Sequence, residues 1–138
     1  MKEYFLSDTH YQRFLIMGEE MELEHFNNSY WRSLLYIFSG DEQLFENRNS
    51  LVDFRNRVIH AENWFTGEYS GGEQRLLALA FNLFTDSDYF EFDNGDRYYI
   101  SPLYVFSGLD EKNYSLAKNA IDVRLESTNT LLKNHNIN

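Results

Sequence analysis

Five carboxylates lie within eleven residues in the second half of the sequence, with no basic residue between them. They are Asp86, Asp88, Glu91, Asp93 and Asp96. Clustered carboxylates supply the oxygen ligands that Ca²⁺ prefers, and a calcium loop spaces them as Asp-x-Asp-x-Asp-Gly. In this chain Phe90 occupies the position of the third ligand. We therefore interpret the acids as a solvent-exposed cluster and predict no metal site.

Other residue types that carry catalysis are sparse. The chain has no cysteine, and its four histidines, at positions 10, 25, 60 and 135, are too dispersed for a zinc motif. Asp110 and Lys112 resemble half of the Asp-x-Lys motif of metal-dependent nucleases. Asp110, however, stands where the N-cap of a helix is expected. We predict no catalytic residue, no bound metal and no cofactor.

The segment that begins with Ser70, Gly71, Gly72 and Glu73 resembles the signature motif of ABC-type ATPases, in which Ser-Gly-Gly at a helix N-terminus contacts a phosphate. Free N–H groups and the helix dipole make such a terminus a site for anions. An ATPase also needs a Gly-rich loop that ends in Gly-Lys-Ser/Thr, and this sequence has none. We interpret Ser70 as a helix N-cap, and Ser70, Gly71 and Gly72 as a weak anion site.

Charge is the most informative property of the chain. Its net charge is −10, and residues 58–96 hold eight acids and one base. Direct binding of nucleic acid needs clustered lysine and arginine, so this composition disfavours it. A negative face instead attracts the basic surface of a partner protein. The alternative interpretation is a solvated face that keeps the protein soluble.

Aromatic residues flank the acidic segment, and tyrosine is enriched at protein interfaces. We therefore predict a partner-binding face from the acids of this segment and two neighbouring tyrosines. Its residues are Glu68, Tyr69, Asp86, Asp88, Tyr89, Glu91, Asp93 and Asp96. The alternative role of the tyrosines is packing within the core and the hairpin.

Helical spacing of apolar residues predicts most of the elements that position these side chains. Helices are expected over 8–22, 30–39 and 70–84, with one or two short helices in 41–59 and a loop over 60–70 that covers Trp64. The second of these helices is apolar nearly all round, which predicts a central position. Gly40 is expected to end it in the left-handed conformation.

The period then changes, and alternation around Asn94 and Gly95 predicts a β-hairpin near residues 88–100 with a type I′ turn. A short helix at 103–106 follows, with Pro102 in its first turn. Asp110 is expected to cap a final helix over 111–132, and the tail 133–138 is expected to fray. The prediction is an α+β fold, mostly helical with five or six helices and one hairpin, in a single domain over 1–138.

The N-terminus lacks the apolar core of a signal peptide, and the longest apolar run, residues 76–81, is far short of the ~20 residues of a spanning helix. We expect a cytoplasmic protein that does not bind membranes.

A set of core apolar residues and helix caps resembles a domain-of-unknown-function family of small acidic proteins from low-GC Gram-positive bacteria and their phages and mobile elements. The segments that carry it are 34–41 (LLYIFSGD), 51–54 (LVDF), 75–84 (RLLALAFNLF) and 106–113 (FSGLDEKN). The resemblance spans roughly residues 30–125. It implies a fold, and a setting in which small acidic proteins act on host machinery in the host cytoplasm.

These observations favour a non-enzymatic regulator or inhibitor that binds a protein with a basic, nucleic-acid-binding surface, as a monomer or homodimer. An anti-defence protein that inhibits CRISPR or restriction enzymes by mimicking nucleic acid is the narrower hypothesis. Two alternatives remain open: a small metal-dependent hydrolase or nuclease, and a homodimeric interaction module.

Overall fold

Helices make up most of the chain in the computed structural model, which describes residues 2–22 and 28–126. Within these residues the α-helices are α1 (Asp8–Met21), α2 (Ser29–Ser39), α3 (Glu42–Glu46), α4 (Arg48–Leu51), α5 (Gly71–Thr85), α6 (Pro102–Ser107) and α7 (Glu111–Leu125). The strands are β1 (Val52–Asp53), β2 (Val58–Ile59), β3 (Tyr89–Glu91) and β4 (Arg97–Tyr99). Two 3-10 turns, η1 (Lys2–Tyr4) and η2 (Ala61–Asn63), complete the set. The predicted class, α+β and mostly helical, is confirmed.

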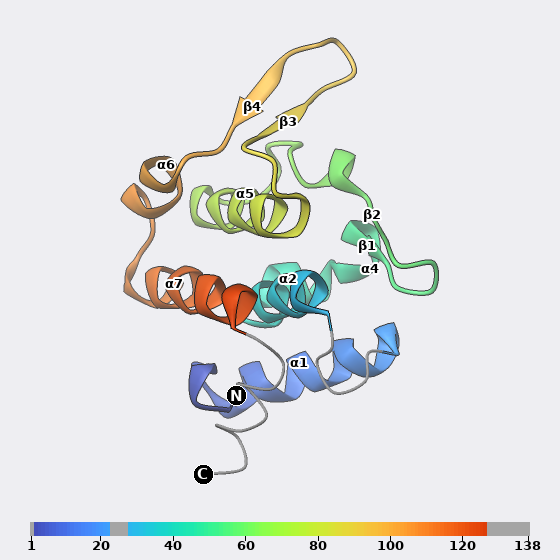
Figure 1. The fold of residues 1–138 in the computed structure, drawn as a ribbon, viewed down its shortest axis with the longest axis vertical. Coiled ribbons are helices and arrows are strands. Elements are labelled where there is room, and N and C mark those ends of the chain that lie inside the picture. Colours follow the sequence, from blue (N-terminus) through green and yellow to red (C-terminus); the bar gives the residue numbers. More distant parts are fainter. Residues whose placement is uncertain (1, 23–27, 127–138) are drawn as a thin grey trace.

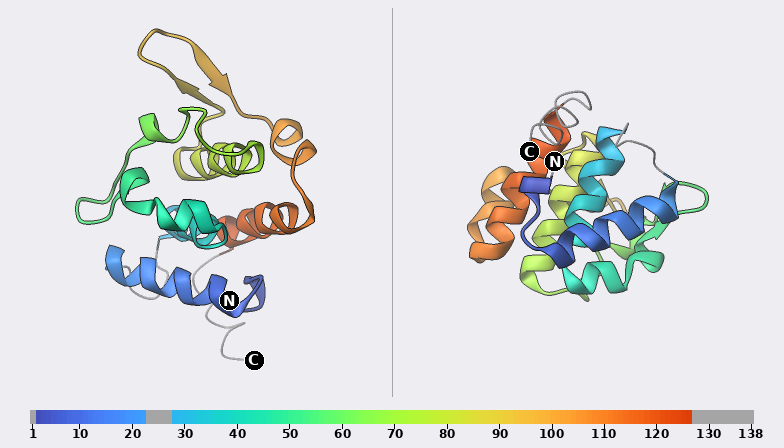
Figure 2. Two further views of the ribbon diagram at one scale, coloured as in Figure 1. Left: turned by 180° about the vertical axis from the view of Figure 1, so that it is seen from behind. Right: turned by 90° about the horizontal axis from the view of Figure 1, so that it is seen from below.

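The helices stack in layers, with α1 at the bottom of Figure 1, α2 and α7 above it, and α5 and α6 above those. Hairpin β3–β4 projects beyond α5 at the far end of the molecule, and the view from behind in Figure 2 shows the same projection. The hairpin that carries most of the predicted acids therefore lies at one end of the molecule.

Helix α2 is the centre of the core, as its all-round apolar sequence predicts. Residues 31–39 are all buried, including the charged side chain of Arg32. Arg32 donates to the carbonyls of Val123 and Glu126 at 2.9 and 2.6 Å, and so binds the C-terminal end of α7. A guanidinium at this position satisfies carbonyls that have no partner within their own helix.

The predicted caps Ser70 and Asp110 begin α5 and α7, and Ser7 and Asp41 begin α1 and α3 in the same way. Ser7, Asp41, Ser70 and Asp110 each accept a hydrogen bond from a backbone N–H in the first turn of the following helix. Helix α7 ends at Leu125, because Glu126 is extended. The rest of the predicted last helix, residues 127–132, and the tail 133–138 lie outside the described residues.

Hairpin β3–β4 occupies the predicted residues, and the N–H of Ile100 donates to the carbonyl of Asp88 at 2.8 Å, which closes its base. The predicted type I′ turn is wrong. The N–H of Gly95 donates to the carbonyl of Phe92 at 2.9 Å, and among the turn residues only Gly95 has a positive φ, 92°. The loop therefore has three residues, a type I turn followed by a left-handed glycine.

Two further features differ from prediction. A second small hairpin, β1–β2, pairs Val52 with Ile59 inside the segment that was expected to be helical. Gly40 ends α2 with φ −88°, so the predicted left-handed conformation is wrong. A Cβ on Gly40 would lie 2.4 Å from Leu116 of α7, so glycine is needed there for close packing.

Another prediction from this part of the sequence is confirmed. The loop over 60–70 covers Trp64, which is fully buried and donates from its indole N–H to the carbonyl of Leu51 at 2.9 Å. None of the helices in the described part of the chain is both long and apolar enough to cross a membrane.

Candidate functional site

The inner face of hairpin β3–β4 is aromatic and holds the hairpin against the helices. Phe90 stacks on Phe65 with ring centroids 4.7 Å apart and meets Phe81 edge-on at 5.6 Å. Tyr98 packs against Phe65 at 5.0 Å, and its hydroxyl shares a hydrogen bond with that of Tyr104. Burial and this hydrogen bond raise the pKa of Tyr98, so the hydroxyl stays protonated. Five rings thus fix the position of the outer face.

The outer face carries a ladder of tyrosines and charges. Tyr89 and Tyr99 are cross-strand partners with ring centroids 6.2 Å apart, and Tyr99 is 66% exposed. Glu91 and Arg97 are the next pair along and form an ion pair at 3.2 Å. The guanidinium of Arg97 also lies 4.3 Å from the centroid of Tyr89. The negative charge of Glu91 is therefore matched on the hairpin itself.

The remaining acids of the hairpin have no basic partner in the described part of the chain. Asp93 and Asp96 lie in and beside the turn, where Asp96 accepts from the side-chain amide of Asn94 at 3.2 Å. Asp88 lies at the base, immediately before β3, and is exposed. These three carboxylates form the unpaired negative charge of the projecting hairpin.

Asp86 has a structural role at the end of α5. It takes the left-handed conformation that ends the helix, with φ 64°. Its carboxylate pairs with Arg124 of α7 at 3.3 Å and accepts from the hydroxyl of Tyr30 of α2 at 3.3 Å. The guanidinium of Arg124 lies 3.7 Å from the centroid of the Tyr30 ring. Asp86 therefore joins three helices, with its charge matched by an arginine.

Glu68 and Tyr69 precede α5, at the opposite end of the helix from Asp86. The helix has 15 residues, so its two ends are ~22 Å apart. Glu68 is exposed, whereas Tyr69 is half-buried and its carbonyl accepts from Gln74 at 2.7 Å. The predicted partner-binding residues thus divide into a hairpin group and two flanking positions.

An apolar groove adjoins the hairpin and was not predicted. It has a volume of about 330 Å³ and lies between α5, α6 and α7. Leu79, Ile100 and Ile121 are among the side chains that line it, and Asp88 lies on its rim. Leu125, also part of its lining, is 74% exposed. Sequence periodicity assigns such apolar residues to the core and does not distinguish a groove from a filled interior.

The N-terminus of α5 is partly occupied by its own capping groups. The Ser70 hydroxyl accepts from the Glu73 N–H, and the Glu73 carboxylate accepts from the Ser70 N–H, both at 3.2 Å. Burial, then a hydrogen bond between the carboxyl groups of Asp41 and Glu73, raises the pKa of Asp41 to about 6. The predicted anion site therefore rests on the N–H groups of Gly71 and Gly72, beside two carboxyl groups.

The residues with catalytic spacing have other roles or stand alone. Asp110 caps α7 by accepting from the Asn113 N–H at 2.8 Å. His60, at the start of η2, lies 3.7 Å from the exposed carboxylate of Glu62. Within residues 2–22 and 28–126, no three histidine, aspartate or glutamate side chains are grouped as metal ligands.

A protein-family model described as a family of unknown function, DUF6075, matches residues 1–136. No curated protein and no solved structure gives a significant match. The matched range includes the hairpin, the groove and the N-terminus of α5.

Proposed function

The chain belongs to this family of unknown function, DUF6075, and we propose that it is a non-enzymatic protein-binding regulator. Its docking face consists of the outer side of hairpin β3–β4 together with the adjoining apolar groove. The partner presents lysine or arginine to the hairpin and an apolar side chain to the groove.

The continuity of groove and hairpin carries this proposal. Asp88 and Ile100 close the base of the hairpin and both line the groove, so acidic and apolar surface meet without a break. Leu125, which lines the groove and is 74% exposed, adds to its apolar part. Contiguous exposed apolar surface with a polar rim is typical of protein-binding sites.

Charge supports the same choice of partner. The hairpin region 88–100 has four acids and one base, and the protein as a whole has a net charge of −10. Such a field raises the rate of association with a basic surface and depends on ionic strength. The apolar groove then supplies contacts that salt does not screen.

The narrower proposal is that the basic surface is one that normally holds nucleic acid, as in an anti-defence inhibitor. Asp88, Asp93 and Asp96 are the carboxylates available to replace phosphates, because Asp86 and Glu91 are paired with arginines. Added DNA or RNA then competes with the protein for its partner.

The test is a quantitative pull-down from a low-GC Gram-positive lysate with the tagged protein and three variants. The hairpin variant is Asp88→Asn/Asp93→Asn/Asp96→Asn, and the groove variant is Leu125→Glu. The control replaces three exposed acids on other elements and changes the net charge equally. It is Glu19→Gln/Glu46→Gln/Glu111→Gln.

We expect the same partner with the wild type and the control, and its loss with the hairpin and groove variants. Equal loss with the control would show that net charge alone drives binding. Retention by the hairpin variant would refute the hairpin as the binding element. Displacement of the partner by added nucleic acid tests the narrower proposal separately.

A further inference from the structure

Strand β4 of hairpin β3–β4 has backbone groups that face away from β3. Antiparallel strands alternate between residues whose backbone groups face the partner strand and residues whose groups face away from it. The N–H of Ile100 donates to the carbonyl of Asp88 at 2.8 Å, so this pair faces inward. Two residues earlier on β4, Tyr98 faces inward in the same way. The backbone groups of Arg97 and Tyr99 therefore point outward from the edge of the hairpin.

The outward edge of β3 is partly closed, whereas that of β4 is open. On β3, the N–H of Tyr89 donates to the Ser87 hydroxyl at 3.2 Å, and this hydroxyl donates to the Tyr89 carbonyl at 2.7 Å. On β4, the outward N–H and carbonyl groups of Arg97 and Tyr99 have no partner within residues 2–22 and 28–126. Both residues are exposed. An edge of this kind is a template for a strand from another chain.

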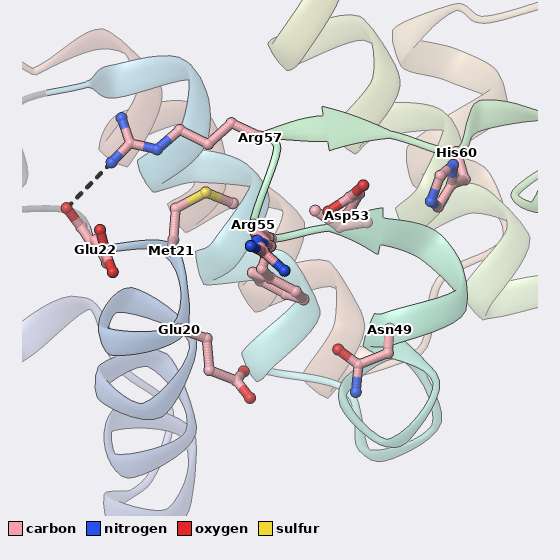
Figure 3. Close-up of a pocket in the computed structure, with 10 residues that line it drawn as sticks. Glu20, Met21, Glu22, Asn49, Asp53, Arg55, Arg57 and His60 are labelled. Atoms are coloured by element: carbon pink, nitrogen blue, oxygen red, sulfur yellow. Dashed lines mark hydrogen bonds between the residues drawn. The ribbon is translucent and has the colours of Figure 1, made fainter.

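The other small hairpin, β1–β2, is shorter, and its edges are partly taken up by neighbouring helices. Its strands have two residues each, and the N–H of Val52 donates to the carbonyl of Arg48 in α4. Figure 3 shows the turn of this hairpin beside the end of α1, where Arg57 donates to the carbonyl of Glu22 at 3.3 Å. The longer and open edge of β4 is therefore the better place for a strand to add.

The sequence of the β4 edge fits a second copy of the same strand. A two-fold axis at Tyr98 sets Arg97 of each copy opposite Tyr99 of the other. Each of these two pairs then exchanges two hydrogen bonds, so the outward groups of both strands all find partners. An axis at Arg97 would set two like charges opposite each other. An axis at Tyr99 would set Arg97 opposite Ser101, whose carbonyl already accepts from Val105 at 3.0 Å.

Side chains and charges agree with the axis at Tyr98. Arg97 then meets the ring of Tyr99 from the other copy, which is 66% exposed in the single chain. It already makes this kind of contact with Tyr89, whose ring centroid lies 4.3 Å from its guanidinium. Asp96 lies opposite Ile100 of the other copy, and the two hairpin turns point in opposite directions. The pairing therefore sets no carboxylate directly opposite another along the strand.

We propose that two copies of the chain pair their β4 strands antiparallel about Tyr98 and so join their hairpins into a four-stranded sheet. This association uses the backbone of the β4 edge, whereas the docking face uses carboxylates and the groove, so either proposal stands if the other fails. The two also respond oppositely to salt. Screening weakens the repulsion between two copies with a net charge of −10 each, but it also weakens attraction to a basic partner.

The test is sedimentation equilibrium of the full chain from about 20 µM to about 1 mM, at low and high salt, because so small a pairing surface gives a weak dimer. Tyr99→Pro removes the outward N–H of β4. It leaves the hydrogen bonds of the hairpin itself in place, since proline is tolerated at an edge where the N–H faces outward. Tyr99→Thr removes the same ring and keeps the N–H. Glu91→Pro makes the equivalent backbone change on the edge of β3.

We expect the wild type, Tyr99→Thr and Glu91→Pro to dimerise, and the association to strengthen with salt. Tyr99→Pro weakens it at least about tenfold, because two of the four hydrogen bonds across the two-fold axis are lost. A wild type that stays monomeric at about 1 mM in high salt would overturn the proposal. So would equal association by Tyr99→Pro, or an association that weakens with salt.

Hydrogen exchange of the wild type, followed by NMR, gives a readout that does not depend on how the variants fold. The amides of Arg97 and Tyr99 exchange rapidly at low protein concentration and become protected as the concentration rises. The outward amide of Glu91, on the opposite edge, stays unprotected. Protection that appears at other residues and not at Arg97 and Tyr99 would show that the copies meet elsewhere, and would overturn the pairing.

Discussion

His10 is expected to make the stability of the fold depend on pH. Its ring is 3% exposed and packs between Phe5 and Tyr36, with centroids 4.7 and 4.6 Å away. Its Nδ1 accepts from the Leu6 N–H at 3.2 Å, so the remaining nitrogen, Nε2, is the one that donates to the Tyr36 carbonyl at 2.8 Å. Both hydrogen bonds need the neutral ring, because a protonated Nδ1 cannot accept.

Burial lowers the pKa of His10 from 6.5 to about 4. As the pH falls below 6.5, the unfolded chain takes up a proton that the folded protein does not, so the free energy of unfolding decreases. The loss is complete near the folded pKa of about 4. This difference in pKa between the folded and unfolded states lowers the free energy of unfolding by about 3 kcal/mol between neutral pH and pH 4.

Asp41 changes the stability of the fold in the opposite direction over part of the same pH range. Its pKa is raised from 3.8 to about 6, so the folded protein holds a proton that the unfolded chain releases. Its contribution to stability is present below the unfolded pKa and is lost as the pH rises through about 6. The two groups nearly cancel between pH 4 and 6, so the wild-type profile alone does not reveal either.

The assay therefore compares urea unfolding of the wild type and His10→Gln at intervals from pH 7.5 to 4. Glutamine has both an acceptor and a donor but does not titrate. The other titratable groups contribute equally to both proteins, so the difference between their free energies of unfolding reports the contribution of His10. We expect the stability advantage of the wild type to fall by about 3 kcal/mol over this range. Parallel profiles would refute the reasoning, as would an NMR titration that gives His10 a pKa near 6.5.

Three substitutions test the packing and backbone arguments by urea unfolding at neutral pH. Gly40→Ala places a Cβ against Leu116 and lowers the free energy of unfolding by about 1–3 kcal/mol; an unchanged value would contradict the close approach. Trp64→Phe removes the indole N–H from the Leu51 carbonyl, which keeps the His60 N–H as its other donor, so the lost hydrogen bond lowers the free energy of unfolding by about 0.5–1.5 kcal/mol; an unchanged value would contradict this role of the indole. Arg57→Gly relieves the left-handed φ and raises stability by about 1 kcal/mol; a loss would show that the side chain supports the turn.

Local rules predicted the elements that depend on local chemistry. Ser70 and Asp110 were assigned as caps because a short side-chain oxygen satisfies the first N–H groups of a helix, and both side chains accept such a hydrogen bond. The central position of α2 followed from apolar residues on all its faces. Both inferences use only the sequence of the element itself and do not depend on which elements pack against it.

The errors in the predictions arise where contacts between residues far apart in the sequence determine the local conformation. Asn94 and Gly95 suit a type I′ turn, but the cross-strand pairing of Glu91 with Arg97 leaves a longer loop, and this fixes the turn type. Gly40 was assigned a left-handed conformation, whereas its constraint comes from Leu116, 76 positions later in the chain. The pairing of Asp86 with Arg124 is equally non-local, so counting acids overstated the unpaired charge.

The same reasoning explains why the apolar groove was not predicted. The groove needs α5, α6 and α7 to leave a gap between them, and no local pattern of residues encodes that gap. Sequence identifies the charges but not their partners, and the partners decide which charges are available to a ligand. Arg97 and Arg57 are alike in sequence terms, yet Glu91 pairs with Arg97 while Arg57 meets only a carbonyl in the described chain.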